Sequence, residues 1–325
     1  ASTTINMTSD KTIQANFEEE SAGPTVSGIS LNHGATIGGN KVTITGTDFV
    51  STPTVTIGGA SATGVTFVSA TEITAIAPAG TAGARDVVVT NPDLSSGTLS
   101  SGYTYVNLVY VHKSTYSGQP DSYWQYTWQL QETLPSGTGA GQTLGGPCNK
   151  LACNIYSDAA CTATLQPQRS AGGVTIRILS PGYLWLHVDD RQLRKRTNDA
   201  QANILGFWTT VTNILYYRLY SPDPGFGAPL TLNETWTYHE QNDSSQSAGD
   251  YDRDGTATVA SATESVTVPA GTFTCYKITY SINSKTFIEW WDASGVFPYA
   301  PVKVQDDYNF ASTDTRELQS STVYP

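Results

Sequence analysis

The sequence predicts an all-β protein with two domains, a small β-sandwich followed by a larger antiparallel β-sheet or open barrel. Short runs of alternating apolar and polar residues, typical of half-buried strands, recur along the chain. Gly, Pro and Asn residues separate these runs and favour turns. With 325 residues, the chain is long enough for two domains that each have a core. We assign residues 24–106 to the sandwich and residues 107–325 to the larger sheet.

The composition narrows the class of partner. The formal net charge is −11 and the pI is near 4.7, which argues against nucleic acids and anionic membranes as partners. Charged residues make up only 14% of the chain, as expected of a secreted β-rich protein. No apolar run reaches about eighteen residues, so we expect no membrane span. We therefore expect an extracellular or cell-surface protein and, since no signal peptide is visible at Ala1, a mature chain or an excised fragment.

Residues 1–20 predict a β-hairpin that stands apart from the sandwich. Apolar residues alternate on both sides of a turn, with Ile5 and Met7 before it and Ile13 and Phe17 after it. The stretch resembles the closing hairpin of the divergent InlB-type B-repeat of bacterial surface proteins. A two-stranded hairpin alone is only marginally stable in water. Two interpretations follow: the tail of an upstream repeat, which we favour, or a strand that pairs with another molecule.

Three segments of the first domain have the pattern of half-buried strands. They are KVTITG at 41–46, TVTIGG at 54–59 and DVVVTN at 86–91. Each places two apolar side chains on one face of the strand. These pairs are Val42 and Ile44, Val55 and Ile57, and Val87 and Val89.

The order of motifs in residues 24–106 resembles the IPT/TIG family of immunoglobulin-like domains. The resemblance rests on the Gly38-Gly39 pair, the ITGTDF strand end, the VTIGG hairpin, the run Ala77-Pro78-Ala79-Gly80 and a closing aromatic strand. It implies an immunoglobulin-like sandwich with a spacer or interaction role. In the transcription-factor branch of this fold, loops bind DNA through basic residues. Here Lys41 and Arg85 face four acidic residues in the domain, so we discard DNA binding.

The second domain again has the pattern of strands. SYWQYTWQL at 122–130 places Trp124, Tyr126 and Trp128 on one face. Similar runs predict about ten strands in an antiparallel meander. A Cys/Gly-rich insertion at 135–173 interrupts them, and we expect it to be almost structureless. The length of residues 203–220 suits either strands or a helix.

A series of motifs near the end of the chain adds a second family resemblance within this domain. VTVPAGTFTCYKITY at 266–280 is followed by the Trp-rich strand FIEWW and a Gly-Val turn. This series resembles uncharacterised bacterial envelope and periplasmic β domains. The resemblance implies an extended antiparallel sheet and no particular reaction.

The four cysteines predict two disulfides in an extracellular chain. They are Cys148, Cys153, Cys161 and Cys275, and three pairings are possible. We prefer Cys148–Cys153 with Cys161–Cys275, because the second bridge would fix the long insertion to a strand. The pairing Cys148–Cys161 with Cys153–Cys275 is the alternative. The four histidines are scattered along the chain, which disfavours a zinc site.

One acidic motif suggests a metal ion. Asp250, Asp252 and Asp254 alternate and are followed by Gly255, as in calcium-binding loops. The twelfth position from Asp250 is Ser261, so the bidentate glutamate of an EF-hand is missing. The two interpretations are a structural calcium ion without a catalytic role and a solvated acidic hairpin tip. Calcium is the one cofactor that the sequence suggests.

The aromatic residues of the second domain offer a candidate sugar-binding surface. All seven tryptophans lie in this domain. Exposed aromatic side chains on a flat sheet would suit stacking on sugars, and Trp208, Trp291 and Tyr299 are our candidates. The alternative is that these side chains fill a wide β core, as aromatic residues usually do.

The chain lacks a recognisable catalytic motif. No Gly-x-Ser-x-Gly elbow, HExxH helix or phosphate loop is present, so we expect neither an enzyme nor a catalytic residue. We predict an extracellular bacterial cell-surface structural protein, such as a stalk, an adhesin or a subunit of a surface assembly. It would act by noncovalent contacts with other copies of itself or with other surface proteins. The alternative is a carbohydrate-binding module of a secreted glycan-active protein, with polysaccharide as the partner.

Overall fold

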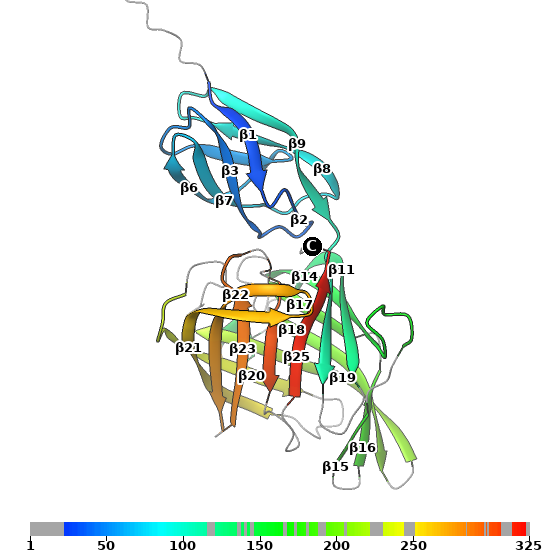
Figure 1. Ribbon diagram of the computed structural model, residues 1–325. Helices are drawn as coiled ribbons and strands as arrows, with labels where there is room; N and C mark the ends of the chain where they lie inside the picture. The colour runs from blue at the N-terminus through cyan, green and yellow to red at the C-terminus, as the bar shows by residue number, and fades with distance from the viewer. Residues whose placement is uncertain are drawn as a thin grey trace, which may run out of the picture.

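The fold was analysed in a computed structural model of the 325-residue chain (Figure 1). It describes residues 23–115, 121–134, 138–139, 142–143, 146–164, 168–171, 174–179, 182–187, 193–204, 207–221, 230–243, 251–283, 285–295, 297, 299–306 and 314–322. Every regular element in these ranges is a strand, which confirms the predicted all-β class.

The first domain is a sandwich of two sheets. One sheet has the order β1 (Thr25–Ser30), β3 (Lys41–Thr47), β7 (Glu72–Ile76) and β6 (Thr63–Ser69). The other has the order β2 (His33–Ala35), β9 (Ser96–Val106), β8 (Gly83–Thr90), β4 (Thr54–Ile57) and β5 (Ala60–Ser61). Neighbouring strands are antiparallel except β2 and β9, which run parallel.

The core of the sandwich lies between its two sheets. The six apolar residues predicted to point inward are all buried there, and so are two tyrosines of β9, Tyr103 and Tyr105. Because alternate residues of a strand point to opposite faces, the local pattern was enough to predict this core.

The second domain is built on one antiparallel sheet of fourteen strands. In spatial order these are β15 (Gln168–Ala171), β16 (Val174–Ile178), β18 (Leu193–Ile204), β17 (Gly182–His187), β14 (Gly146–Tyr156), β11 (Ser122–Leu134), β10 (Val109–Thr115), β25 (Asp314–Ser321), β24 (Lys303–Asp306), β23 (Lys285–Asp292), β22 (Gly271–Ile282), β21 (Tyr251–Val268), β20 (Thr235–Asp243) and β19 (Phe207–Ser221). A separate two-stranded sheet joins β12 (Thr138–Gly139) and β13 (Gln142–Thr143).

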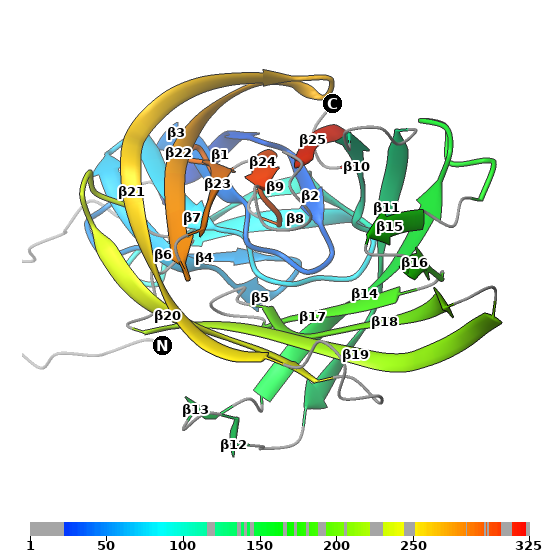
Figure 2. The same ribbon diagram turned by 90° about the horizontal axis from the view of Figure 1, so that it is seen from below.

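An additional pairing closes the large sheet on itself. β18 pairs with β17 and β16 along one edge and with β19 along the other, so the last strand in the order returns to the start (Figure 2). The sheet is therefore closed rather than open, with β15 and β16 as an extension. Pairing of this kind satisfies the backbone groups that an edge strand would leave exposed.

Two segments of this domain differ from the sequence-based expectation. In the segment 203–220, which suited a helix or strands, the described residues belong to β18 and β19, in keeping with the β-branched and aromatic residues of β19. Residues 146–156, in the insertion expected to be almost structureless, form β14 between β11 and β17. The alternating side chains of Leu151, Cys153 and Ile155 are buried and hold this strand against the core.

The closed sheet has a buried inner face and a polar outer face. On β10, Tyr110, His112 and Ser114 are buried, whereas Lys113 between them is partly exposed. Lys113 lies in a row of residues that are in register across neighbouring strands: Lys277, Trp290, Lys303, Glu317 and Lys113. The charged residues of this row are partly exposed, whereas Trp290 is only 6% exposed and belongs to the buried cluster around Tyr110. Lys303 and Glu317 form an ion pair of 2.9 Å, and two lysines lie over the Trp290 ring. Each exposed pair contributes little stability by itself.

Candidate functional site at the domain junction

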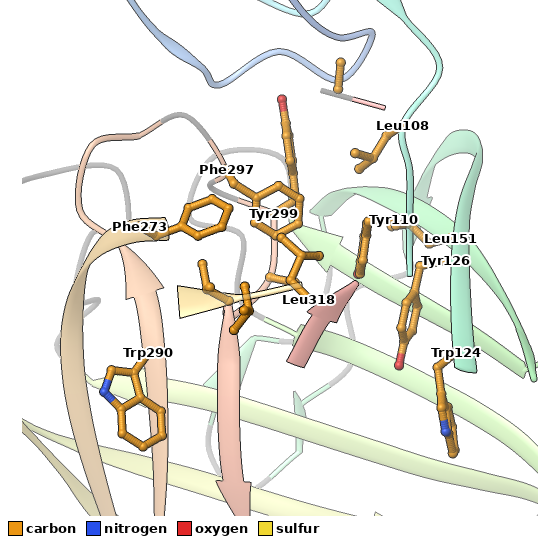
Figure 3. Close-up of a cluster of buried hydrophobic side chains, with 14 of the residues drawn as sticks. Leu108, Tyr110, Trp124, Tyr126, Leu151, Phe273, Trp290, Phe297, Tyr299 and Leu318 are labelled. Carbon is orange, nitrogen blue, oxygen red and sulfur yellow. The ribbon is translucent and has the colours of Figure 1, made fainter. Parts of the chain in front are cut away.

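The junction between the two domains combines a shared apolar core with buried hydrogen bonds. Ala35 of β2 and Leu108, just after β9, are fully buried in the same cluster as Tyr110 and Leu318 of the closed sheet (Figure 3). Ile37 and Val106 of the sandwich pack against that cluster. The two domains therefore do not have fully separate cores.

Tyr299 connects the domains through its hydroxyl group. It lies between β23 and β24 of the closed sheet and is only 3% exposed. Its hydroxyl lies within hydrogen-bond distance of two acceptors, the carbonyl of Gly38 at 3.2 Å and Oδ1 of Asn40, which share its single proton. Asn40 is itself fully buried at the start of β3. A hydrogen bond between buried partners is costly to remove, because it leaves a polar group without water or a substitute.

The backbone around Asn40 forms a second set of contacts at the junction. The amide of Lys41 donates to the carbonyl of Gly295, which belongs to the closed-sheet domain. Within the sandwich, the amide of Ala77 donates to the carbonyl of Asn40. Gly38 has a φ of +69°, and a Cβ at this position would lie 2.4 Å from the carbonyl carbon of Pro78. The Gly38-Gly39 pair of the family motif therefore has a steric role at the junction.

The phenols of this region are neutral, and those of Tyr105 and Tyr299 donate hydrogen bonds. Burial, and secondarily the neighbouring Tyr299, raises the pKa of Tyr103 well above its ordinary value. Burial raises the pKa of Tyr105 to about 12, and its hydroxyl donates to the carbonyl of Pro78 at 2.8 Å. Such groups can fix a geometry but are poorly suited to proton transfer near neutral pH. The chemistry of the junction is therefore that of a rigid connection.

The predicted calcium ligands lie outside this junction. Asp250 falls outside the described residues, and Asp252 and Asp254 lie two residues apart on β21. Oδ1 of Asp254 is 2.9 Å from Nδ1 of His239 on the neighbouring strand. In the described ranges, no three His, Cys, Asp or Glu side chains are grouped as metal ligands. The calcium site stays a prediction.

The structure corrects both favoured disulfide pairings. All four cysteines are described, and no disulfide joins them. Cys148 and Cys153 lie five residues apart on the extended β14, about 16 Å along the strand. A disulfide requires Cα atoms within about 7 Å. Cys161 follows the other end of β14, in a turn closed by the bridge between Tyr156 and Thr164, so the alternative Cys148–Cys161 pairing is also out of reach.

The aromatic sugar-binding candidates do not form one exposed surface. Tyr299 is buried at the junction and cannot stack on a glycan, so this candidate is wrong. Trp291 packs against the cluster around Tyr280 and donates from Nε1 to Glu289 at 2.9 Å. The backbone of Trp208 lies on β19 opposite Asn203, and its side chain is outside the described part.

Charged and titratable groups that were not predicted from the sequence lie on the buried face of the sheet. Glu240 is fully buried on β20 and forms an ion pair of 3.1 Å with Arg253 of β21. His112 is 6% exposed, and its Nε2 donates to the carbonyl of Pro301 at 2.8 Å. The alternation on β10 could have indicated that His112 is buried, whereas the Glu240–Arg253 pair depends on the register of β20 and β21.

The pKa is raised for two cysteine thiols of the second domain, the buried Cys275 and the partly exposed Cys161. Burial, with Asp292 and Glu264 nearby, raises the pKa of Cys275 to about 12. Burial, followed by the effect of Asp158, also raises the pKa of Cys161. A thiol reacts mainly as the thiolate, so both groups are poor nucleophiles near neutral pH.

Comparison with known proteins identifies one domain and a second segment. Residues 24–106 match the family model of the IPT/TIG domain, which confirms the resemblance seen in the sequence. Residues 242–301 match a family model described as DUF3108-like. No curated protein matches the chain. The parts of the chain that the structure describes contain no helix that could span a membrane.

Solved structures give only distant likenesses. A protein of unknown function from Bacteroides thetaiotaomicron is 11% identical, with a TM-score of 0.25, covering 86% of this chain and 72% of its own. An auxiliary nutrient binding protein from Bacteroides ovatus is 12% identical, with a TM-score of 0.22 and coverages of 93% and 90%. An auxiliary nutrient binding protein from Bacteroides thetaiotaomicron is 9% identical, with a TM-score of 0.24, covering 93% of this chain and 90% of its own. At such TM-scores these likenesses support no conclusion about fold or function.

Proposed function

We propose that this protein is a structural protein of the bacterial cell surface, in which the IPT/TIG domain is a rigid spacer that holds the closed-sheet domain at a fixed orientation. The observation that carries this proposal is the junction, where Tyr299 of one domain bonds to Gly38 and Asn40 of the other. The spacer role is the one that the IPT/TIG match suggests for residues 24–106.

The physical basis of the proposal is the cost of bending at the junction. Domains joined by a small polar interface usually move relative to one another, whereas a continuous apolar core opposes such motion. Bending here would separate Ala35, Ile37 and Val106 of the sandwich from the cluster that contains Tyr110. It would also break the hydrogen bonds of Tyr299 and that between Lys41 and Gly295. A spacer needs this resistance in order to define a distance and a direction.

Noncovalent action and an extracellular location are the other parts of the proposal. The neutral phenols of the junction and the protonated thiol of Cys275 favour packing over covalent chemistry. The low share of charged residues and the β-rich fold suit a secreted protein. The burial of Tyr299 weakens the alternative of polysaccharide binding, because it removes one of three candidate stacking residues.

Calorimetric unfolding of the full chain tests the rigid junction. If the junction couples the domains, the unmodified chain unfolds in a single transition. In Tyr299→Phe, that transition separates into two, or the sandwich unfolds at a lower temperature. The matched control is Tyr123→Phe, which alters a partly exposed tyrosine of β11 away from the junction. Two independent transitions in the unmodified chain would overturn the proposal. Antibody labelling of intact cells that express the chain tests the surface location.

A further inference from the structure

The longest of the four edge strands of the sandwich is β6. The sheet edges are β1, β6, β2 and β5, and of these β2 has three residues and β5 has two. β6 has seven residues and pairs only with β7. Five of its seven residues are exposed and two are partly exposed. An edge of this kind presents unpaired backbone N–H and C=O groups to any strand that approaches it.

The sequence of β6 lacks the charged residues and prolines that often protect a strand edge, although its pairing with β7 is irregular at two places. The strand reads TGVTFVS, without a charged residue or a proline. Val68 is 52% exposed and Phe67 is 36% exposed. Proteins commonly guard edges with lysine, proline or bulges. Register shifts between Thr63 and Thr66 and between Phe67 and Ser69 interrupt the pairing with β7, but Thr66 and Phe67 stay in continuous register.

We propose that β6 accepts residues 12–17 of a neighbouring copy as an added antiparallel strand. This inference rests on the proposed structural role, because it supplies the contact by which copies join. The segment TIQANF alternates Ile13, Ala15 and Phe17 with polar residues, carries no charge and has six residues against the seven of β6. Strand addition of this type gains affinity from backbone hydrogen bonds and specificity from alternate side chains.

Electrostatic repulsion between two copies is smallest where uncharged segments meet, as residues 12–17 and β6 would. The chain carries a formal charge of −11, so two copies repel each other over most of their surfaces. Both TIQANF and β6 are free of charge. Val65 of β6 packs against the sandwich core, and an apolar side chain of the added strand would extend that packing toward Phe67. Pairs of aromatic and aliphatic side chains across strands stabilise a sheet in this way.

The position of β1 sets the alternative that the test must exclude. β1, to which residues 1–22 connect, lies at the opposite edge of the same sheet from β6, with β3 and β7 between them. Three strand spacings amount to about 14 Å, which the length of residues 18–24 is enough to span. A second copy meets the edge of β6 without this crossing, and only that pairing makes the mass rise with concentration.

The test measures the mass of the full chain by light scattering over a range of protein concentrations. We expect the mass to rise with concentration, and removal of residues 1–20 to leave a monomer. Val68→Lys, which places a charge on the edge, should weaken association at least tenfold. The control Val50→Lys makes the same change at a residue that is 51% exposed but lies in the loop after β3, and it should have no effect. Circular dichroism verifies that both variants fold.

A synthetic peptide of residues 11–18 provides an independent readout. If the proposal holds, the peptide binds to the chain that lacks residues 1–20, slows hydrogen exchange of the β6 amides, and binds at least tenfold more weakly to the Val68→Lys variant. The proposal is overturned if the intact chain is monomeric at all concentrations, or if Val68→Lys associates as well as Val50→Lys. The rigid spacer is tested separately by the unfolding of the junction, so failure of strand addition leaves it standing.

Discussion

His112 should make the stability of the closed-sheet domain depend on pH in a defined window. Burial, reinforced by the charge of Arg316, lowers the pKa of His112 from 6.5 to about 4, although its hydrogen bond to Pro301 acts in the opposite direction. Tyr110 and Tyr126 face the ring, and Leu318 and Trp124 lie beside it in register. The folded protein therefore keeps this imidazole neutral while the unfolded chain takes up a proton.

The sign and size of the effect follow from linkage. Between pH 6.5 and about 4 the unfolded state binds more protons at this histidine than the folded state does, so stability falls as the pH falls. The contribution is complete above pH 6.5 and is lost through this window. The difference between 6.5 and about 4 corresponds to roughly 3 kcal/mol of unfolding free energy.

Urea unfolding at pH 7, 6, 5 and 4 measures this contribution. His112→Gln replaces the ring with a group that can still donate to the Pro301 carbonyl but does not titrate. Carboxylates titrate equally in both proteins, so the difference between their pH profiles isolates His112. Between pH 7 and pH 4, we expect the unfolding free energy of His112→Gln to fall by roughly 3 kcal/mol less than that of the unmodified chain. The control is His33→Gln, at a partly exposed histidine of the sandwich, whose profile should follow that of the unmodified chain. Parallel profiles for His112→Gln and the unmodified chain would refute the reasoning.

Three other predictions concern buried groups. Tyr299→Phe removes the buried hydroxyl that donates to Asn40 and should reduce the unfolding free energy by about 1–3 kcal/mol, measured by urea unfolding against Tyr123→Phe. Glu240→Gln breaks the buried ion pair with Arg253 and should reduce the unfolding free energy by about 3–5 kcal/mol. Glu317→Gln, at the more exposed pair with Lys303, should reduce it by about 1 kcal/mol or less. Equal reductions for the two variants would contradict the burial of Glu240. Cys275, with a pKa of about 12, should resist alkylation by iodoacetamide at pH 8 until urea unfolds the chain. The labelled cysteine is located by peptide mass, and rapid labelling of Cys275 in the native protein would contradict its burial.

Much of the fold could be predicted from local patterns. The inward residues of the sandwich, such as Val42 and Ile44, alternate with polar neighbours, and this alternation survives in the folded structure. The same holds for Trp124 and Tyr126 of β11, which are buried on the inner face. Strand formation in these segments depends mainly on neighbouring residues along the chain, so the sequence alone is informative.

The remaining features depend on contacts between distant segments. Closure of the large sheet requires β18 to pair on both edges, and no local pattern encodes that pairing. Tyr299 lies in an irregular connection between β23 and β24, where no periodicity indicates its burial, and its partners Gly38 and Asn40 are about 260 residues away in the chain. Glu240 and Arg253 similarly become a buried pair only through strand register. The candidate site was therefore missed because it is formed entirely by long-range contacts.

Residual dipolar couplings of the backbone amides in the full chain test the central claim most directly. Couplings from the sandwich and from the closed sheet each define an alignment tensor. If the junction fixes the two domains, both sets fit one tensor with the orientation seen in Figure 1, and Tyr299→Phe reduces the agreement. Two tensors of different magnitude in the unmodified chain would mean that the domains move independently, and the rigid spacer would be contradicted.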